Sequence, residues 1–132
     1  MEERLRRHRK LLRDGRSASF TIADPDTDEF RGEVLLHTFE WAHARAALGV
    51  WMRRAARRRG MALDALRIIC DWAFDELALA RIEFTTLPSN GAMISLGERA
   101  GFQVEGTLRS YTLERGVRRD LVMMSLLPGE LR

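Results

Sequence analysis

The amino-acid sequence predicts a mixed α/β domain with a mostly antiparallel sheet flanked by helices. Short apolar or alternating runs, which favour strands, are separated by segments whose apolar residues recur at helical spacing. The expected order is helix, three strands, helix, strand, helix and two strands, a layered arrangement. With 132 residues, 45% of them hydrophobic, the chain is long enough for one core and one domain.

The first elements are assigned from local composition. Residues 1–16 are expected to hold a basic helix, over 2–14, with Leu5 and Leu12 as its thin apolar stripe. Strands are expected at residues 18–23, 32–43 and 46–52, with an Asx-rich turn over 24–28. The first two strands are expected to pair as a hairpin.

A helix is expected over residues 61–79, directly after a glycine-bearing turn. Its apolar stripe is Leu63, Leu66, Cys70, Ala73 and Leu77. A turn from a strand into a helix leaves backbone N–H groups unpaired at the positive end of the helix dipole. Such a turn is a ready site for phosphate oxygens, so Gly60 marks a candidate phosphate-binding loop. Cys70 lies on the apolar stripe and is expected to be a buried structural thiol.

The next block reads as strand, short helix and hairpin. Residues 81–87 alternate and are β-branched, and Pro88 stops the strand. Ser89 or Asn90 is expected to cap the following helix, which Gly101 ends with positive φ while Phe102 folds back. Two further strands are expected between residues 104 and 127.

Two of these motifs carry a family resemblance. The string Arg57-x-x-Gly60-x-Ala62 resembles the acetyl-coenzyme A pyrophosphate loop of the GCN5-related N-acetyltransferases (GNAT). The later order of strand, Pro-x-Asn, ten-residue helix and Gly-Phe is also that of the family. The final hairpin resembles that of the ribosomal-protein N-terminal (alanine) acetyltransferase branch. The resemblance covers residues 17–127.

The resemblance implies a GNAT-like sheet with a V-shaped splay between strands 46–52 and 81–87. The pantetheine arm of acetyl-coenzyme A would insert into the V and pair with the first strand as an added strand does. An acceptor amine would attack the thioester directly, with a backbone N–H, that of Met52, polarising the carbonyl. The implied cofactor-binding residues are Val50, Met52, Arg57, Arg58, Arg59, Gly60, Met61, Ala62 and Asn90.

The acid and base depart from the family pattern. Where relatives place a catalytic glutamate, this chain has Thr85 or Ala47, and where they place the tyrosine or serine acid it has Gly97 or Met93. An α-amine, with a reference pKa of about 7.7–8.0, needs less help from a base than lysine, so the departure favours protein N-terminal amines. The candidate substitutes are Glu83 and Glu40 as the base and Tyr111 as the acid. The alternative is a non-catalytic coenzyme A-binding or structural remnant of the fold.

A third hypothesis, from a different class, is a basic nucleic-acid-binding module. The net charge is +3, and five of the seven residues from Arg53 to Arg59 are arginine. However, 21 arginines and one lysine fit a GC-rich genome better than recognition chemistry, and no aromatic residues interleave with the arginines. No metal site is expected, because His37 and His43 would lie about 20 Å apart on one strand.

Compartment and assembly are also expectations. No signal peptide and no apolar run of membrane-spanning length is visible in this sequence, and its single cysteine excludes an internal disulfide. We therefore expect a cytoplasmic protein. Family members begin with a strand and helix that this sequence lacks, so it is either a fragment or a short protein that completes its cleft by dimerising. An unpaired sheet edge would favour a homodimer.

Overall fold

A seven-stranded sheet organises the part of the chain that the computed structural model describes, residues 4–7, 16–54 and 60–132. The strands are β1 (Arg4–Arg7), β2 (Ser17–Ala23), β3 (Phe30–Glu40), β4 (Arg45–Met52), β5 (Arg81–Thr86), β6 (Gln103–Glu114) and β7 (Val117–Leu126). The helices are α1 (Met61–Glu76) and α2 (Gly91–Ala100), with a 3-10 turn, η2, over Trp41–His43. The mixed α/β class and the order of elements after residue 17 are confirmed.

The sheet order is β1-β2-β3-β4-β5-β7-β6, and one neighbouring pair, β4 with β5, is parallel. These two strands pair at only three positions, Arg45 with Arg81, Ala46 with Ile82 and Ala47 with Glu83. Beyond the last pair, β4 continues along β3 and β5 continues along β7, so the two strands separate. The predicted V-shaped splay is therefore present, and its apex lies at Ala47 and Glu83.

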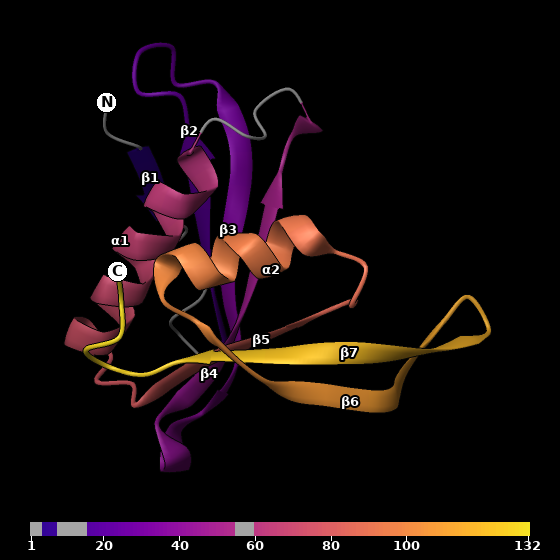
Figure 1. Ribbon diagram of the computed structural model, residues 1–132. Coiled ribbons are helices and arrows are strands. Elements are labelled where there is room, and N and C mark those ends of the chain that lie inside the picture. Colours follow the sequence, from indigo (N-terminus) through magenta and orange to yellow (C-terminus); the bar gives the residue numbers. More distant parts are fainter. Residues whose placement is uncertain (1–3, 8–15, 55–59) are drawn as a thin grey trace.

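Helices α1 and α2 lie over the same face of the sheet (Figure 1). Alternate strand residues point into the core beneath them because side chains along a strand alternate between the two faces. The ring of Phe20 packs edge-on against Trp72 of α1, and Phe84 packs against Phe102 after α2. Gly97 lets α2 approach β5 closely, since a Cβ there would lie 2.7 Å from the Phe84 ring. Neither described helix is long and apolar enough to cross a membrane.

The prediction of an N-terminal helix is wrong for the residues of that segment that the structure describes as an element. Residues Arg4–Arg7 form β1, which pairs antiparallel with Phe20–Ala23 of β2. Pairing satisfies the backbone groups of the β2 edge, a tertiary gain that overrides helix propensity in a short segment. Part of the edge expected to be unpaired is thus covered within the chain. The rest of the predicted helix, including Leu12, lies outside the described residues.

Two predicted boundaries also shift. Strand β3 ends at Glu40 rather than residue 43, because η2 and Ala44, with φ 51°, turn the chain into β4. Helix α1 ends at Glu76 rather than residue 79, where Ala78 adopts φ 53° and the N–H groups of Leu77 and Leu79 both donate to the Ala73 carbonyl. Alanine in a left-handed position gives no sequence signal for a helix end, unlike glycine.

The β6–β7 hairpin extends away from the rest of the molecule (Figure 1). Its pairing includes two irregularities, one between Val104 and Gly106 and one between Leu108 and Thr112. Apolar side chains on this arm remain in solvent, with Tyr111 60% and Leu113 61% exposed.

Candidate functional site

A cavity of ≈ 780 Å³ lies at the open end of the splay. Its walls come from the end of β4, the start of α1, and the start and one side of α2. The lining residues are Val50, Trp51, Met52, Gly60, Ala62, Leu63, Asn90, Ala92, Met93, Ser95, Leu96 and Arg99. Five of the residues predicted to bind the cofactor, separated by up to 40 positions in sequence, are therefore brought to one cavity: Val50, Met52, Gly60, Ala62 and Asn90.

The β4 wall presents a strand edge. On one side β4 is paired with β3 along its length, from Glu40–Arg45 to Gly32–Met52. On the other side no described strand pairs with β4 beyond Ala47. An edge of this kind accepts an added strand or any extended chain that carries amide groups. Val50, in the middle of this stretch, is half-buried and lines the cavity.

The α1 wall presents the beginning of a helix. Gly60 is the N-cap, with φ 77°, and among the residues that the structure describes no side chain caps the helix. The first intrahelical bond runs from the Asp64 N–H to the Gly60 carbonyl, 3.1 Å. The preceding N–H groups stand at the positive end of the dipole next to the cavity. Met61, also predicted to bind the cofactor, is buried in the core, and Arg57, Arg58 and Arg59 lie outside the described residues.

The start of α2 differs, because it is capped. The Asn90 Oδ1 accepts the Met93 N–H at 3.2 Å, so Asn90 rather than Ser89 is the cap. The carboxamide nitrogen of Asn90 is not needed for the cap and is a donor available at the cavity wall. At the other end, Gly101 has φ 108° and the Phe102 N–H donates to the Gly97 carbonyl, as predicted.

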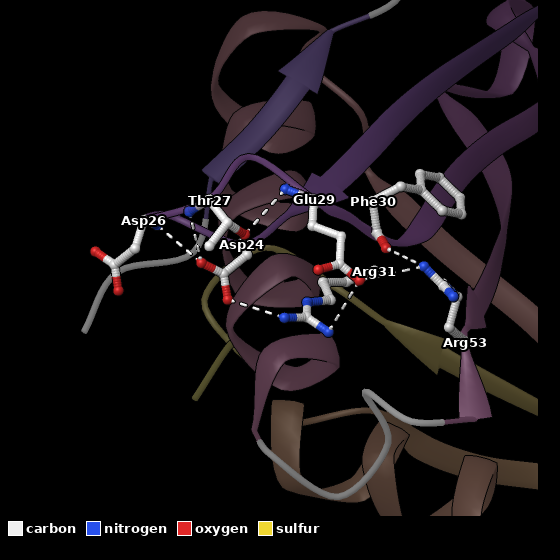
Figure 2. A network of polar contacts seen from close by, with 7 residues as sticks. All are labelled: Asp24, Asp26, Thr27, Glu29, Phe30, Arg31 and Arg53. Carbon is white, nitrogen blue, oxygen red and sulfur yellow. Dashed lines mark hydrogen bonds and ion pairs between the residues drawn. The ribbon is translucent and has the colours of Figure 1, made fainter.

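A polar network fixes the point where the chain leaves β4 for α1 (Figure 2). The Arg53 N–H donates to the Arg31 carbonyl at 2.8 Å, and the Arg53 Nη1 reaches the Phe30 carbonyl at 3.3 Å and Glu29 at 3.4 Å. These contacts tie the first residue after β4 to the β2–β3 hairpin. The entry to the loop therefore has a defined position relative to the sheet.

The hairpin turn in this network is itself held by a carboxylate. Asp24 accepts the backbone N–H groups of Thr27 and Asp26 and pairs with the Arg31 guanidinium at 3.2 Å. Because all these partners favour the charged form, the backbone donors first, the pKa of Asp24 is lowered to about 2. Figure 2 shows the Arg31 side chain lying between Asp24 and Glu29, where it joins the two halves of the network.

The three candidate acid–base residues lie apart from one another. Glu83 is half-buried at the apex of the splay, opposite Ala47, and its Oε1 accepts from Arg81 at 2.8 Å. Glu40 is at the end of β3, opposite Arg45, and Tyr111 is on the extended hairpin arm. None of the three is among the residues that line the cavity.

Sequence reasoning missed seven of the twelve residues that line the cavity. Ala92, Ser95 and Arg99 recur at spacings of three and four on α2, beside the predicted core stripe of Met93, Leu96 and Ala100. A row of small and polar residues next to an apolar stripe was the available signal. Trp51 and Leu63 also line the cavity, and neither carried a functional signal.

Cys70 is confirmed as a structural residue. It is fully buried on α1, and burial in apolar surroundings raises the pKa of its thiol to about 12. A thiol of this kind is not ionised at neutral pH and does not act as a nucleophile.

The fold is that of an acetyltransferase family that comparison with known proteins identifies. A family model described as an acetyltransferase (GNAT) domain matches residues 1–103. The chain is 33% identical to the N-acetyltransferase p20 of Bacillus licheniformis, named as uncharacterised, over 91% of this chain and 67% of that protein. The chain belongs to the GNAT family.

Two further comparisons agree with the family and the fold. YdaF of Bacillus subtilis, named as an inferred ribosomal N-acetyltransferase, is 31% identical over 75% of this chain and 54% of its own length. The structure of a spermidine N-acetyltransferase SpeG mutant from Vibrio cholerae superposes with a TM-score of 0.81 at 23% identity, over 88% of this chain and 68% of that one. At this identity the superposition shows the shared fold.

Proposed function

We propose that this protein transfers the acetyl group of acetyl-coenzyme A to a primary amine. The observation that carries the proposal is the cavity at the open end of the β4–β5 splay, which joins an available strand edge to an uncapped helix start. Membership of the GNAT family supports the same reaction. The residues present fit the cofactor, which supplies the activated thioester.

Each wall of the cavity has a part in binding. The edge of β4 around Val50 pairs with the amides of the pantetheine arm, as an added strand would. The N–H groups that follow Gly60 bind the pyrophosphate oxygens, aided by the dipole of α1. The carboxamide of Asn90 donates to the arm from the opposite wall. The thioester then lies towards the apex, near Ala47 and Glu83.

The chemistry at the apex requires one base and one acid. The amine nitrogen attacks the carbonyl carbon, the C–S bond breaks, and coenzyme A leaves as a thiolate that must gain a proton. Glu83 is the proposed base, since its Oε1 accepts a hydrogen bond from Arg81 and its Oε2 forms no hydrogen bond or ion pair within the described residues. Met93 and Gly97 stand where the family has its serine or tyrosine, so the proposed source of the proton for the thiolate is solvent.

The proposed acceptor is a protein N-terminal α-amine. Such an amine is partly neutral near pH 8, so a carboxylate engaged with Arg81 is a sufficient base. The similarity to YdaF, named for ribosomal N-acetylation, supports a protein acceptor. We also propose a cytoplasmic location, where ribosomal proteins and acetyl-coenzyme A are both present.

The experiment that tests the proposal is a turnover assay with acetyl-coenzyme A and matched acceptors. The panel contains a peptide with a free α-amine, the same peptide with that amine blocked and one lysine added, and spermidine. The proposal expects release of coenzyme A with the first acceptor and much less with the other two. Preference for spermidine or lysine would contradict the acceptor, and no release with any would contradict the activity.

The alternative is a protein that binds coenzyme A without efficient turnover. One observation favours it, namely that the positions where relatives carry catalytic groups hold Thr85, Ala47, Gly97 and Met93. This alternative expects saturable binding of acetyl-coenzyme A in the absence of any acceptor-dependent release.

A further inference from the structure

Arg99 is a cation in the cavity wall that the binding scheme above does not use. It lies in the last turn of α2, one helical turn beyond Ser95, and lines the same cavity as Gly60 and Ala62. Its side chain is exposed, and it forms no hydrogen bond or ion pair within the described part of the chain. The structure therefore presents a guanidinium at the cavity without a polar partner among residues 4–7, 16–54 and 60–132.

The chemistry of the proposed ligand explains such a residue. Coenzyme A carries two separate phosphate centres, the pyrophosphate and the 3′-phosphate on the ribose. The uncapped start of α1 serves one of them with backbone donors. The start of α2 cannot serve the other in the same way, because Asn90 caps it. An arginine side chain forms paired charge-assisted hydrogen bonds with phosphate oxygens, so it can supply the donors and the positive charge for the second phosphate centre.

We propose that Arg99 binds the 3′-phosphate of coenzyme A and so makes the site selective for coenzyme A over its 3′-dephospho form. This inference rests on the proposed function, since it assigns a residue to the same cofactor. It concerns recognition rather than chemistry, because Arg99 lies on α2 nine positions beyond Asn90, at the other end of the helix from the arm-binding wall.

A structural role for Arg99 has to be separated from this one. A cation in the last turn of a helix interacts favourably with the dipole, so its loss alone would weaken α2 slightly. That effect would lower affinity for any coenzyme A derivative to the same extent. The informative quantity is therefore the ratio of the two dissociation constants, for coenzyme A and for 3′-dephospho-coenzyme A.

Isothermal titration of both ligands into four proteins tests the proposal. The proteins are the wild type, Arg99→Gln, Arg99→Lys and the control Arg109→Gln, which removes an exposed arginine on the β6 arm. We expect the wild type and Arg109→Gln to bind coenzyme A roughly tenfold or more tightly than the dephospho form, as for one charged hydrogen-bonded contact. Arg99→Gln should bind both alike, and Arg99→Lys should retain part of the ratio.

Three results would overturn the inference. One is a wild type that does not distinguish the two ligands, and another is an Arg99→Gln variant that keeps the full ratio. The third is wild-type protein that binds neither ligand, which would also remove the proposed function. The first two results would overturn the role of Arg99 alone and leave the proposed function standing.

Discussion

At the scale of single residues, a substitution of Glu83, at the splay apex, distinguishes an active enzyme from a protein that only binds coenzyme A. Glu83→Gln preserves the shape and one hydrogen bond with Arg81 but removes the proton acceptor. We expect kcat to fall by about 10² or more with little change in the KM of acetyl-coenzyme A. The loss should shrink for acceptor amines of lower pKa, which depend less on a base.

Matched variants of the other candidates provide the controls for steady-state kinetics. Glu40→Gln and Tyr111→Phe change residues away from the splay apex, at the end of β3 and on the β6 arm, and should leave kcat within about twofold of wild type. A Glu83→Gln enzyme as active as wild type would remove Glu83 from the mechanism. A large loss in Tyr111→Phe would instead show that the hairpin arm reaches the reacting atoms.

At the scale of elements, the sequence predicted helix and strand ends correctly where the end requires a particular residue type. Gly101 and Asn90 mark the two ends of α2 because a left-handed C-cap and an N-cap each demand particular residues. The end of α1 at Ala78 and the strand β1 carried no such signal, since both depend on tertiary contacts. Five of the twelve residues that line the cavity were predicted, for the same reason. Turn motifs are local signals, whereas Ala92, Ser95 and Arg99 line the cavity only because of how α2 packs.

An ion-pair network joins the three strands of the C-terminal half. The Arg81 guanidinium donates to Glu105 at 2.6 and 2.9 Å from Nη1 and Nη2, and the Ser125 hydroxyl also donates to Glu105. Arg81 first, and Ser125 second, lower the pKa of Glu105 to about 2. Since a free glutamate titrates near pH 4.3, the contribution of Glu105 to stability is present above that pH and is lost as pH falls towards 2.

This network predicts a specific acid dependence of unfolding. Glu105→Gln should be less stable than wild type at pH 7, and the difference should narrow between about pH 4.5 and pH 2 as wild-type Glu105 becomes protonated. Glu114→Gln, on the same strand and without an ion pair in the described residues, is the control and should follow the wild type. Urea unfolding across this pH range measures both. A difference that stays constant with pH would contradict the assignment.

At the scale of the whole molecule, the extended β6–β7 arm bears on assembly. Tyr111 and Leu113, two positions apart on β6, present exposed apolar side chains on one face of the arm. We propose a homodimer that buries them. Light scattering should give twice the chain mass for wild type and for Ile68→Glu, an exposed control on α1, and the monomer mass for Leu113→Glu. A monomeric wild type at high concentration would end the dimer proposal.

The central claim is that the cavity at the splay holds acetyl-coenzyme A, and thermal melting with and without the cofactor tests it most directly. At about a hundred times its Kd, a ligand stabilises the native state by about 2.7 kcal/mol, which raises Tm by several degrees in a domain of this size. Gly60→Asp places a negative charge at the open start of α1, whereas Gly60→Asn adds nearly the same shape without charge. Within the described part of the chain, a Cβ at this position meets no neighbour within 4 Å. The account predicts a rise in Tm for wild type, a smaller rise for Gly60→Asn and none for Gly60→Asp. A folded wild type whose Tm does not change with acetyl-coenzyme A would contradict it.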